Sequence, residues 1–148
     1  MEIIEQVNRP IDGFCSGIGT GGTITGIGEV LKKHNPQMTI WAVEPENAAI
    51  LSGGSIGTHL QMGIGDGIIP DILNTKIYDD VCIIKDEEAI KASKKLASLE
   101  GIMCGISSGT NVAAAIKLAK KLGKGKTVVT VLPDTAERYF STPLFEEN

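Results

Sequence analysis

The chain has 148 residues and a formal net charge of −4 at pH 7, with 42% hydrophobic and 22% charged residues, which suits one globular domain and argues against nucleic-acid binding. It has no membrane-spanning apolar run and no signal peptide, so we expect a cytoplasmic protein without membrane contact. The three cysteines, Cys15, Cys82 and Cys104, lack metal-binding spacing and lie in apolar contexts, which predicts buried free thiols and no metal site.

Four short apolar runs are predicted as strands. Their apolar residues are consecutive rather than alternating, which indicates strands that are covered on both faces. Strands of this kind, with helical patterns between them, predict an α/β domain with a mainly parallel sheet. The runs are Ile11–Cys15, Thr39–Val43, Val81–Ile84 and Thr127–Leu132.

Three helical patterns lie between or after these runs. Residues 24–31 repeat apolar side chains at helical spacing. A second pattern begins at Asp86, a good N-cap, and ends near Gly101. A third covers residues 112–119, and Gly123 is placed to end it.

Two segments fit neither pattern. Residues 52–70 are rich in glycine and show little periodicity, which predicts a long loop of the kind that often carries function. Residues 137–148 are also predicted to be irregular, because Pro143 would break any helix there.

The stretch Ser16–Gly26 holds five glycines and joins the first strand to the first helical pattern. A turn of this kind is suited to an anion, because the first N–H groups of a helix have no partner within it and the peptide dipoles favour negative charge. Its Gly-x-Gly-x-x-Gly spacing is typical of dinucleotide-binding folds, and Glu44 ends the next strand, where a ribose would be held. Thr20 and Thr23 instead favour a terminal phosphate, and Pro45 makes the Glu44 segment equally typical of a turn.

Three further segments contain polar residues beside glycines. Gly105–Thr110 precedes a helix, and we expect Ser107 or Ser108 to be its N-cap. The other two segments are Met62–Pro70 and Leu132–Thr142. With the glycine stretch, these segments resemble, in the same order, the cysteine synthase (O-acetylserine sulfhydrylase) and cystathionine β-synthase family of pyridoxal-phosphate enzymes. The segments Leu51–Gly54 and Ser141–Phe145 are similar to the cysteine synthase branch.

The resemblance implies the three-layer α/β architecture of fold type II pyridoxal-phosphate enzymes, with tryptophan synthase β as another example, and pyridoxal 5′-phosphate as cofactor. It implies that Ser107 hydrogen-bonds the pyridine nitrogen, that Pro133 and Asp134 lie near the same ring edge, and that Gly63 and Gly65 line the substrate cleft. A neutral serine would not hold that nitrogen protonated, which suits β-elimination without a long-lived carbanion. The implied phosphate-binding residues are Gly19, Thr20, Gly21, Gly22 and Thr23.

The family depends on a lysine that forms a Schiff base with the cofactor, and no lysine here lies in the motif that carries it. The chain therefore resembles the C-terminal half of such an enzyme, as one α/β domain over residues 1–148 that begins inside a helix before the first strand. We expect the chain alone to be inactive, and to self-associate or to require the other half through exposed apolar surface and strand edges.

The implied activity is β-replacement on O-acetyl-L-serine with sulfide to give L-cysteine. Asp66 stands where the family usually has a small residue, so it is either a solvated loop residue or a group that favours L-cysteine as substrate with release of sulfide. The implied partners are a second copy of the intact enzyme and the tail of serine acetyltransferase. A nicotinamide-binding domain and a non-catalytic binding module are the competing interpretations.

Overall fold

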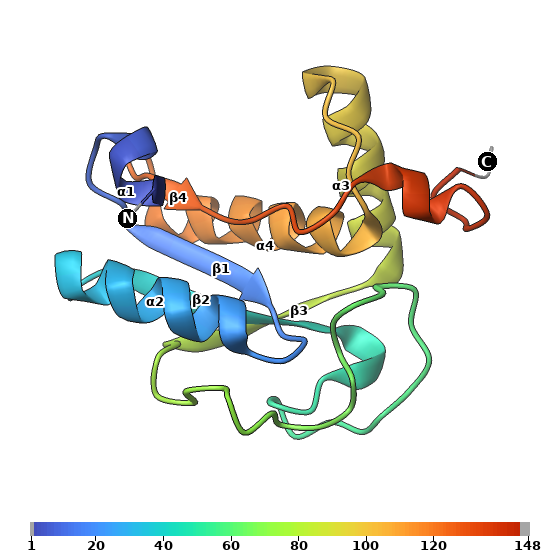
Figure 1. Cartoon of the computed structure of the whole chain (residues 1–148), viewed down its shortest axis with the longest axis horizontal. Helices are drawn as coiled ribbons and strands as arrows, with labels where there is room; N and C mark the ends of the chain where they lie inside the picture. The colour runs from blue at the N-terminus through green and yellow to red at the C-terminus, as the bar shows by residue number, and fades with distance from the viewer. Residues whose placement is uncertain (1, 146–148) are drawn as a thin grey trace.

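The computed structural model describes residues 2–145 (Figure 1). Its regular elements are helices and strands in the predicted order, with two consecutive helices before the last strand and one long irregular segment between the second and third strands. They are α1 (Glu2–Val7), β1 (Gly13–Gly17), α2 (Gly22–His34), β2 (Thr39–Pro45), β3 (Asp80–Ile84), α3 (Asp86–Glu100), α4 (Ile106–Leu122) and β4 (Val128–Val129), with short 3₁₀ turns at Glu46–Ala48 and Ala136–Tyr139.

The four strands form one parallel sheet in the order β3-β2-β1-β4. β1 pairs with β2 along its whole length, from Gly13 opposite Thr39 to Gly17 opposite Val43. All the strands run in the same direction, so their carboxyl ends meet at one edge of the sheet. At that edge the β1–α2 turn begins.

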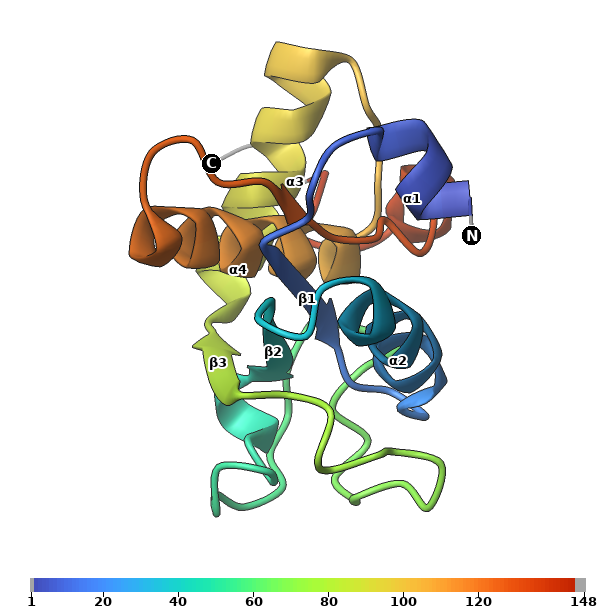
Figure 2. The same cartoon turned by 90° about the vertical axis from the view of Figure 1, so that its left-hand side faces the viewer.

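Helices cover both faces of the sheet, which confirms the predicted three-layer α/β architecture (Figure 2). Neighbouring residues of a strand point to opposite faces. Phe14 and Ile40 belong to the apolar cluster that includes α2, whereas Cys15 and Trp41 belong to the cluster that includes α4. Both faces are buried at β1 and β2, which explains why these strands read as continuous apolar runs. The edge strand β3 is covered on one face, and the prediction of burial on both faces is wrong there, since Ile83 is exposed.

The three cysteines are free and buried, as the sequence predicts. Burial is the main cause that raises the pKa of the Cys15 thiol to about 12, and burial likewise raises the pKa of Cys82. Among residues 2–145, no helix is both long enough and apolar enough to span a membrane.

The predicted strand over Thr127–Leu132 is much shorter in the structure, where β4 has two residues. Side chains replace the sheet hydrogen bonds beyond β4. The Thr130 hydroxyl donates to the Cys15 carbonyl at 2.7 Å, and the Asn111 side-chain amide donates to the Val131 carbonyl at 2.8 Å. The segment after β4 therefore runs alongside β1 without continuing the strand.

Two predicted helix caps are wrong. Asp86 is the first residue of α3, after the N-cap Lys85, and its carboxylate accepts hydrogen bonds from Leu60 N and Gln61 Nε2. Neither Ser107 nor Ser108 caps α4, because the helix starts earlier, after Gly105. The predicted irregular tail also contains the 3₁₀ turn Ala136–Tyr139, and residues 146–148 of that tail lie outside the described residues.

The irregular segment between β2 and β3 extends beyond the predicted loop at both ends, and is drawn in green at the bottom of Figure 1. Gln61 anchors it and is fully buried. The Gln61 amide donates to the Ile84 carbonyl at 3.0 Å and accepts from the Thr110 hydroxyl at 2.9 Å. These bonds hold the next residues, Met62–Ile64, near the carboxyl ends of the strands.

Candidate active site

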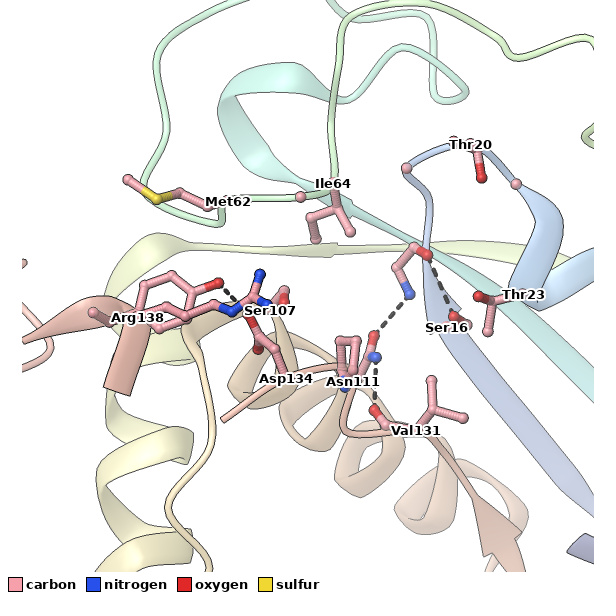
Figure 3. Close-up of a pocket in the computed structure, with 16 residues that line it drawn as sticks. Ser16, Thr20, Thr23, Met62, Ile64, Ser107, Asn111, Val131, Asp134 and Arg138 are labelled. Carbon is pink, nitrogen blue, oxygen red and sulfur yellow. Dashed lines mark hydrogen bonds between the residues drawn. The ribbon is translucent and has the colours of Figure 1, made fainter. Parts of the chain in front are cut away.

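A pocket of about 580 Å³ opens at the carboxyl-end edge of the sheet (Figure 3). Ligands of open parallel sheets bind at this edge. The β1–α2 turn, Met62–Ile64, the first turns of α4 and the segment after β4 form its walls. Thr20 and Thr23 lie toward one end, and Ser107, Asp134 and Arg138 gather at the other.

The β1–α2 turn forms a glycine loop, defined here as Gly17–Thr23. Gly21 has φ +82, and a Cβ there would lie 2.7 Å from Leu73 Cβ. A Cβ on Gly19 would lie 2.5 Å from the Gly63 carbonyl oxygen. Only glycine fits at these two positions, because a side chain would collide with the neighbouring segment in both and strain the backbone at Gly21.

The amino terminus of α2 is open for an anion. Its N-cap, Gly21, has no side chain to cap it, and its first turn has no acidic residue. Gly22 N–H makes only a long hydrogen bond of 3.5 Å to the Thr20 hydroxyl. Thr20 and Thr23 line the pocket beside it and bring two hydroxyl groups. Free N–H groups, a favourable helix dipole and hydroxyl donors are the features that hold a phosphate.

The amino terminus of α4 faces the same pocket but already has an anion beside it. A Cβ on Gly105 would collide with Asp134 Oδ1. Gly105 N–H and the Ser108 hydroxyl both donate to the Asp134 backbone carbonyl, at 3.2 and 3.4 Å. Of the two helix termini at the pocket, only that of α2 is therefore free for a bound anion.

Ser107 is the second residue of α4 and lines the pocket. Within residues 2–145, no side chain or backbone group forms a hydrogen bond with its hydroxyl. Asp134 lines the same end, but its carboxylate accepts a hydrogen bond from the Tyr139 hydroxyl through Oδ2, and its Oδ1 is buried without a partner. The Ser107 hydroxyl is thus free to bond a ligand at this end, where the Arg138 side chain also lines the pocket.

Asn111 connects the two sides of the pocket, as Figure 3 shows. It is 3% exposed, accepts from Gly17 N–H at 2.7 Å through Oδ1, and donates to the Val131 carbonyl at 2.8 Å through Nδ2. The side chain satisfies one backbone donor and one backbone acceptor that no strand pairing serves. It therefore fixes the start of the glycine loop relative to the segment after β4.

Most of the sequence-predicted site residues meet at this pocket. Gly22, Gly65 and Asp66 do not line it, and Asp66 is exposed on the neighbouring loop. The predicted residues that line it are Gly19, Thr20, Gly21, Thr23, Gly63, Ser107, Pro133 and Asp134.

Several lining residues were missed by the sequence analysis, among them Asn111, Arg138 and Tyr139. Arg138 and Tyr139 belong to the segment Leu132–Thr142, which the sequence analysis had singled out, so this segment could have pointed to them. Asn111 follows directly after Gly105–Thr110. It is a polar residue within an apolar helical pattern, and this could have identified it as a site residue. Among the described residues, no cluster of three histidine, cysteine or acidic side chains could hold a metal.

Glu44 does not lie where a dinucleotide would need it. It is 4% exposed, and its carboxylate accepts from Leu51 N–H at 2.7 Å, from Ser52 N–H at 3.2 Å and from the Ser52 hydroxyl at 3.1 Å. These donors belong to the start of the long irregular segment. Glu44 therefore stabilises a turn, and the glycine loop lacks the ribose acceptor expected of a nicotinamide-binding domain.

A parallel α/β sheet with an open helix terminus at this edge defines a domain that binds a phosphorylated cofactor. The profile of the family described as pyridoxal-phosphate dependent enzyme matches residues 1–134. The chain belongs to this family, whose cofactor is pyridoxal phosphate, and its architecture is that of fold type II.

Similar proteins are cysteine synthases and related enzymes. The chain is 52% identical over 145 residues to the cysteine synthase of Staphylococcus aureus, which covers 97% of this chain and 47% of the relative. It matches O-acetyl serine sulfhydrylase isoform 3 from Entamoeba histolytica with a TM-score of 0.95 and 42% identity, over 99% of this chain and 44% of that one. A hydrogen sulfide-producing enzyme from Fusobacterium nucleatum matches with a TM-score of 0.92 and 41% identity, over 99% and 45%. The chain spans about half the length of these relatives.

The pocket fits the family's cofactor. The glycine loop can pass this close to Gly63 and Leu73 at the α2 terminus because Gly19 and Gly21 carry no Cβ. The opposite end offers the free hydroxyl of Ser107, which suits a ring nitrogen. The donor set thus matches a molecule with a phosphate arm and a pyridine ring.

Proposed function

We propose that this chain forms the phosphate-binding and ring-nitrogen side of the active site of a pyridoxal-phosphate-dependent cysteine synthase. The reaction would be β-replacement on O-acetyl-L-serine with sulfide, giving L-cysteine. The observation that carries the proposal is that two helix termini face one pocket and only that of α2 is open for an anion. The substrate class comes from the relatives, which are a cysteine synthase and an O-acetyl serine sulfhydrylase.

In this proposal, each end of the pocket binds one part of the cofactor. The N–H groups of the glycine loop and the hydroxyls of Thr20 and Thr23 hold the phosphate, and the Ser107 hydroxyl donates to the ring nitrogen. Gly63, which lines the pocket and has no side chain, leaves space for the amino-acid substrate. When bound, pyridoxal phosphate withdraws electrons from an attached amino acid and so weakens bonds at its α- and β-carbons.

The covalent lysine must come from elsewhere, because no lysine lies among the residues that line the pocket. We propose that the chain alone has no turnover. In the whole enzyme the lysine-bearing half would close the pocket and cover exposed apolar residues such as Met62 and Leu132. It would also cover β4, which pairs on one side only.

A chimera tests this function. The region of the S. aureus cysteine synthase that matches this chain is replaced by residues 1–148, and cysteine formation from O-acetylserine and sulfide is measured. We expect the chimera to make cysteine and the chain alone to make none. A folded chimera that binds pyridoxal phosphate without making cysteine would contradict the proposal, as would turnover by the chain alone.

Release of sulfide from L-cysteine is a second candidate activity. It is favoured by the similarity to a hydrogen sulfide-producing enzyme and by Asp66, which lies two residues after the pocket-lining Ile64. An exposed carboxylate there could move a proton at the leaving thiol. In the chimera, Asp66→Ala should lower sulfide release from L-cysteine by about tenfold or more while O-acetylserine use is kept. Equal loss, or no loss, with both substrates would exclude this role.

The proposed partners follow from the same assignment. The intact enzyme would bind a small amino-acid substrate, would form a homodimer and would bind the tail of serine acetyltransferase at its cleft, in the cytoplasm. The support on this chain is the apolar, glycine-rich loop beside the pocket, where Ile68 and Ile69 are exposed.

A further inference from the structure

Asp134 presents a difficulty for the proposed role of Ser107. A carboxylate beside a pyridine nitrogen attracts a proton to that nitrogen, because an opposite charge favours the charged form. Asp134 and Ser107 lie at the same end of the pocket. In the structure, however, one oxygen of the Asp134 carboxylate accepts a hydrogen bond from Tyr139, the other is buried, and Arg138 brings a positive charge to the same end of the pocket.

Tyr139 holds one oxygen of that carboxylate. Tyr139 is 5% exposed, and its hydroxyl donates to Asp134 Oδ2. Burial first, and then the contact with Asp134, raise the pKa of the Tyr139 phenol to about 12, so the phenol remains a donor at neutral pH. The Thr142 hydroxyl donates to the Tyr139 carbonyl at 2.6 Å and fixes the turn that carries the ring.

The other carboxylate oxygen lies at the amino terminus of α4. Asp134 Oδ1 is inaccessible to solvent and packs against Gly105, where no Cβ would fit. No N–H group of the described residues donates to this oxygen, so it is the dipole at the amino terminus of α4 that favours the negative charge there. Neither oxygen of Asp134 is therefore available to a ligand in the pocket.

We propose that the Tyr139 hydroxyl and the helix dipole at the start of α4, together with the nearby positive charge of Arg138, compensate the charge of Asp134, so that the ring nitrogen of the cofactor meets the Ser107 hydroxyl without an uncompensated negative charge beside it. Tyr139 is thus a positioning residue, since it acts on the cofactor through Asp134. The inference rests on the proposed function, because it concerns the ring nitrogen of the bound cofactor. It explains how an acidic residue can line this end of the pocket in an enzyme that needs the nitrogen unprotonated.

The test uses the full chain and pyridoxine 5′-phosphate labelled with ¹⁵N in its ring. This probe has no aldehyde, so it cannot react with surface lysines. The ¹⁵N chemical shift of the bound probe is followed against pH in wild type and in Tyr139→Phe, Asp134→Asn and the double variant. Tyr78→Phe, which removes the other tyrosine, is the matched control.

We expect Tyr139→Phe to raise the proton affinity of the bound ring nitrogen about tenfold, because Asp134 then lacks its donor. The proton affinity of the ring nitrogen should stay within about twofold of wild type in the three other variants, Asp134→Asn, the double variant and Tyr78→Phe. None of these changes leaves an uncompensated carboxylate. If the role of Tyr139 were purely structural, Tyr139→Phe would lower thermal stability without moving the midpoint of the ¹⁵N titration curve.

Two results would overturn the inference, and they have different meanings. If Tyr139→Phe binds the probe and its midpoint equals that of wild type, the positioning role is wrong while the cofactor site stands. If wild type does not bind the probe at all, the cofactor assignment fails and the inference fails with it. The hydrogen bond itself can be tested in the cofactor-free chain by a downfield hydroxyl proton signal. A signal that is lost in Tyr139→Phe and Asp134→Asn but kept in Tyr78→Phe would support the hydrogen bond. Absence of the signal from wild type would refute it.

Discussion

Replacing Gly19 with alanine is expected to lower the affinity of the chain for pyridoxine 5′-phosphate by about a hundredfold. The new Cβ would lie 2.5 Å from the Gly63 carbonyl oxygen. That oxygen belongs to backbone, so the two segments must move apart. The glycine loop would then lose the alignment of its N–H groups with the phosphate.

The matched control for this variant is Gly26→Ala, in α2 after the glycine loop. A Cβ on Gly26 would meet nothing within 4 Å, so this change should leave the affinity unchanged and stabilise α2 by about 0.5–1 kcal/mol. Affinity is measured by isothermal titration calorimetry, and folding is checked by circular dichroism. Equal affinities for folded Gly19→Ala and wild type would place the phosphate elsewhere.

Replacing Asn111 with alanine is expected to lower the free energy of unfolding by about 2–5 kcal/mol. The change leaves two groups without a partner, the Gly17 N–H and the Val131 carbonyl. Both are far from other partners in the sheet, because β4 ends at Val129. The same change should weaken phosphate binding, since Gly17 begins the glycine loop. Urea denaturation gives the free energy.

Asn111→Asp separates the two hydrogen bonds. The new carboxyl can still accept from Gly17 N–H, but when ionised it faces the Val131 carbonyl without a proton to donate. The folded state therefore prefers the protonated carboxyl, and its pKa is raised. The destabilisation relative to wild type should be small at about pH 4 and grow as the pH rises toward about pH 8. A pH-independent difference would contradict the hydrogen-bond assignment.

The layered fold could be predicted from the sequence because its signal is local. Runs such as Ile11–Cys15 are apolar at every position, which indicates burial on both faces, and Phe14 and Cys15 do point to opposite faces. The strand after Lys126 could not be bounded in this way. It ends early because Thr130 and Asn111 supply side-chain hydrogen bonds that depend on the tertiary structure.

The site shows the same division between local and distant signals. Gly19 and Gly21 could be predicted from their spacing, since a strand–turn–helix that binds an anion requires such residues. The cap at Asp86 was predicted wrongly because the Leu60–Gln61 segment, distant in the sequence, takes up its carboxylate. The orientation of Asp134 toward Tyr139 depends on how the tail folds over α4, and no local pattern reports it.

The central claim is that the open terminus of α2 and the start of α4 together hold a phosphorylated pyridine. The most direct measurement is a ¹H–¹⁵N correlation spectrum of the chain titrated with pyridoxine 5′-phosphate. The largest shifts should appear at the amides of residues 19–23 and of Ser107, with inorganic phosphate shifting only the first group. Shifts confined to other surfaces, or none at saturating probe, would contradict the account.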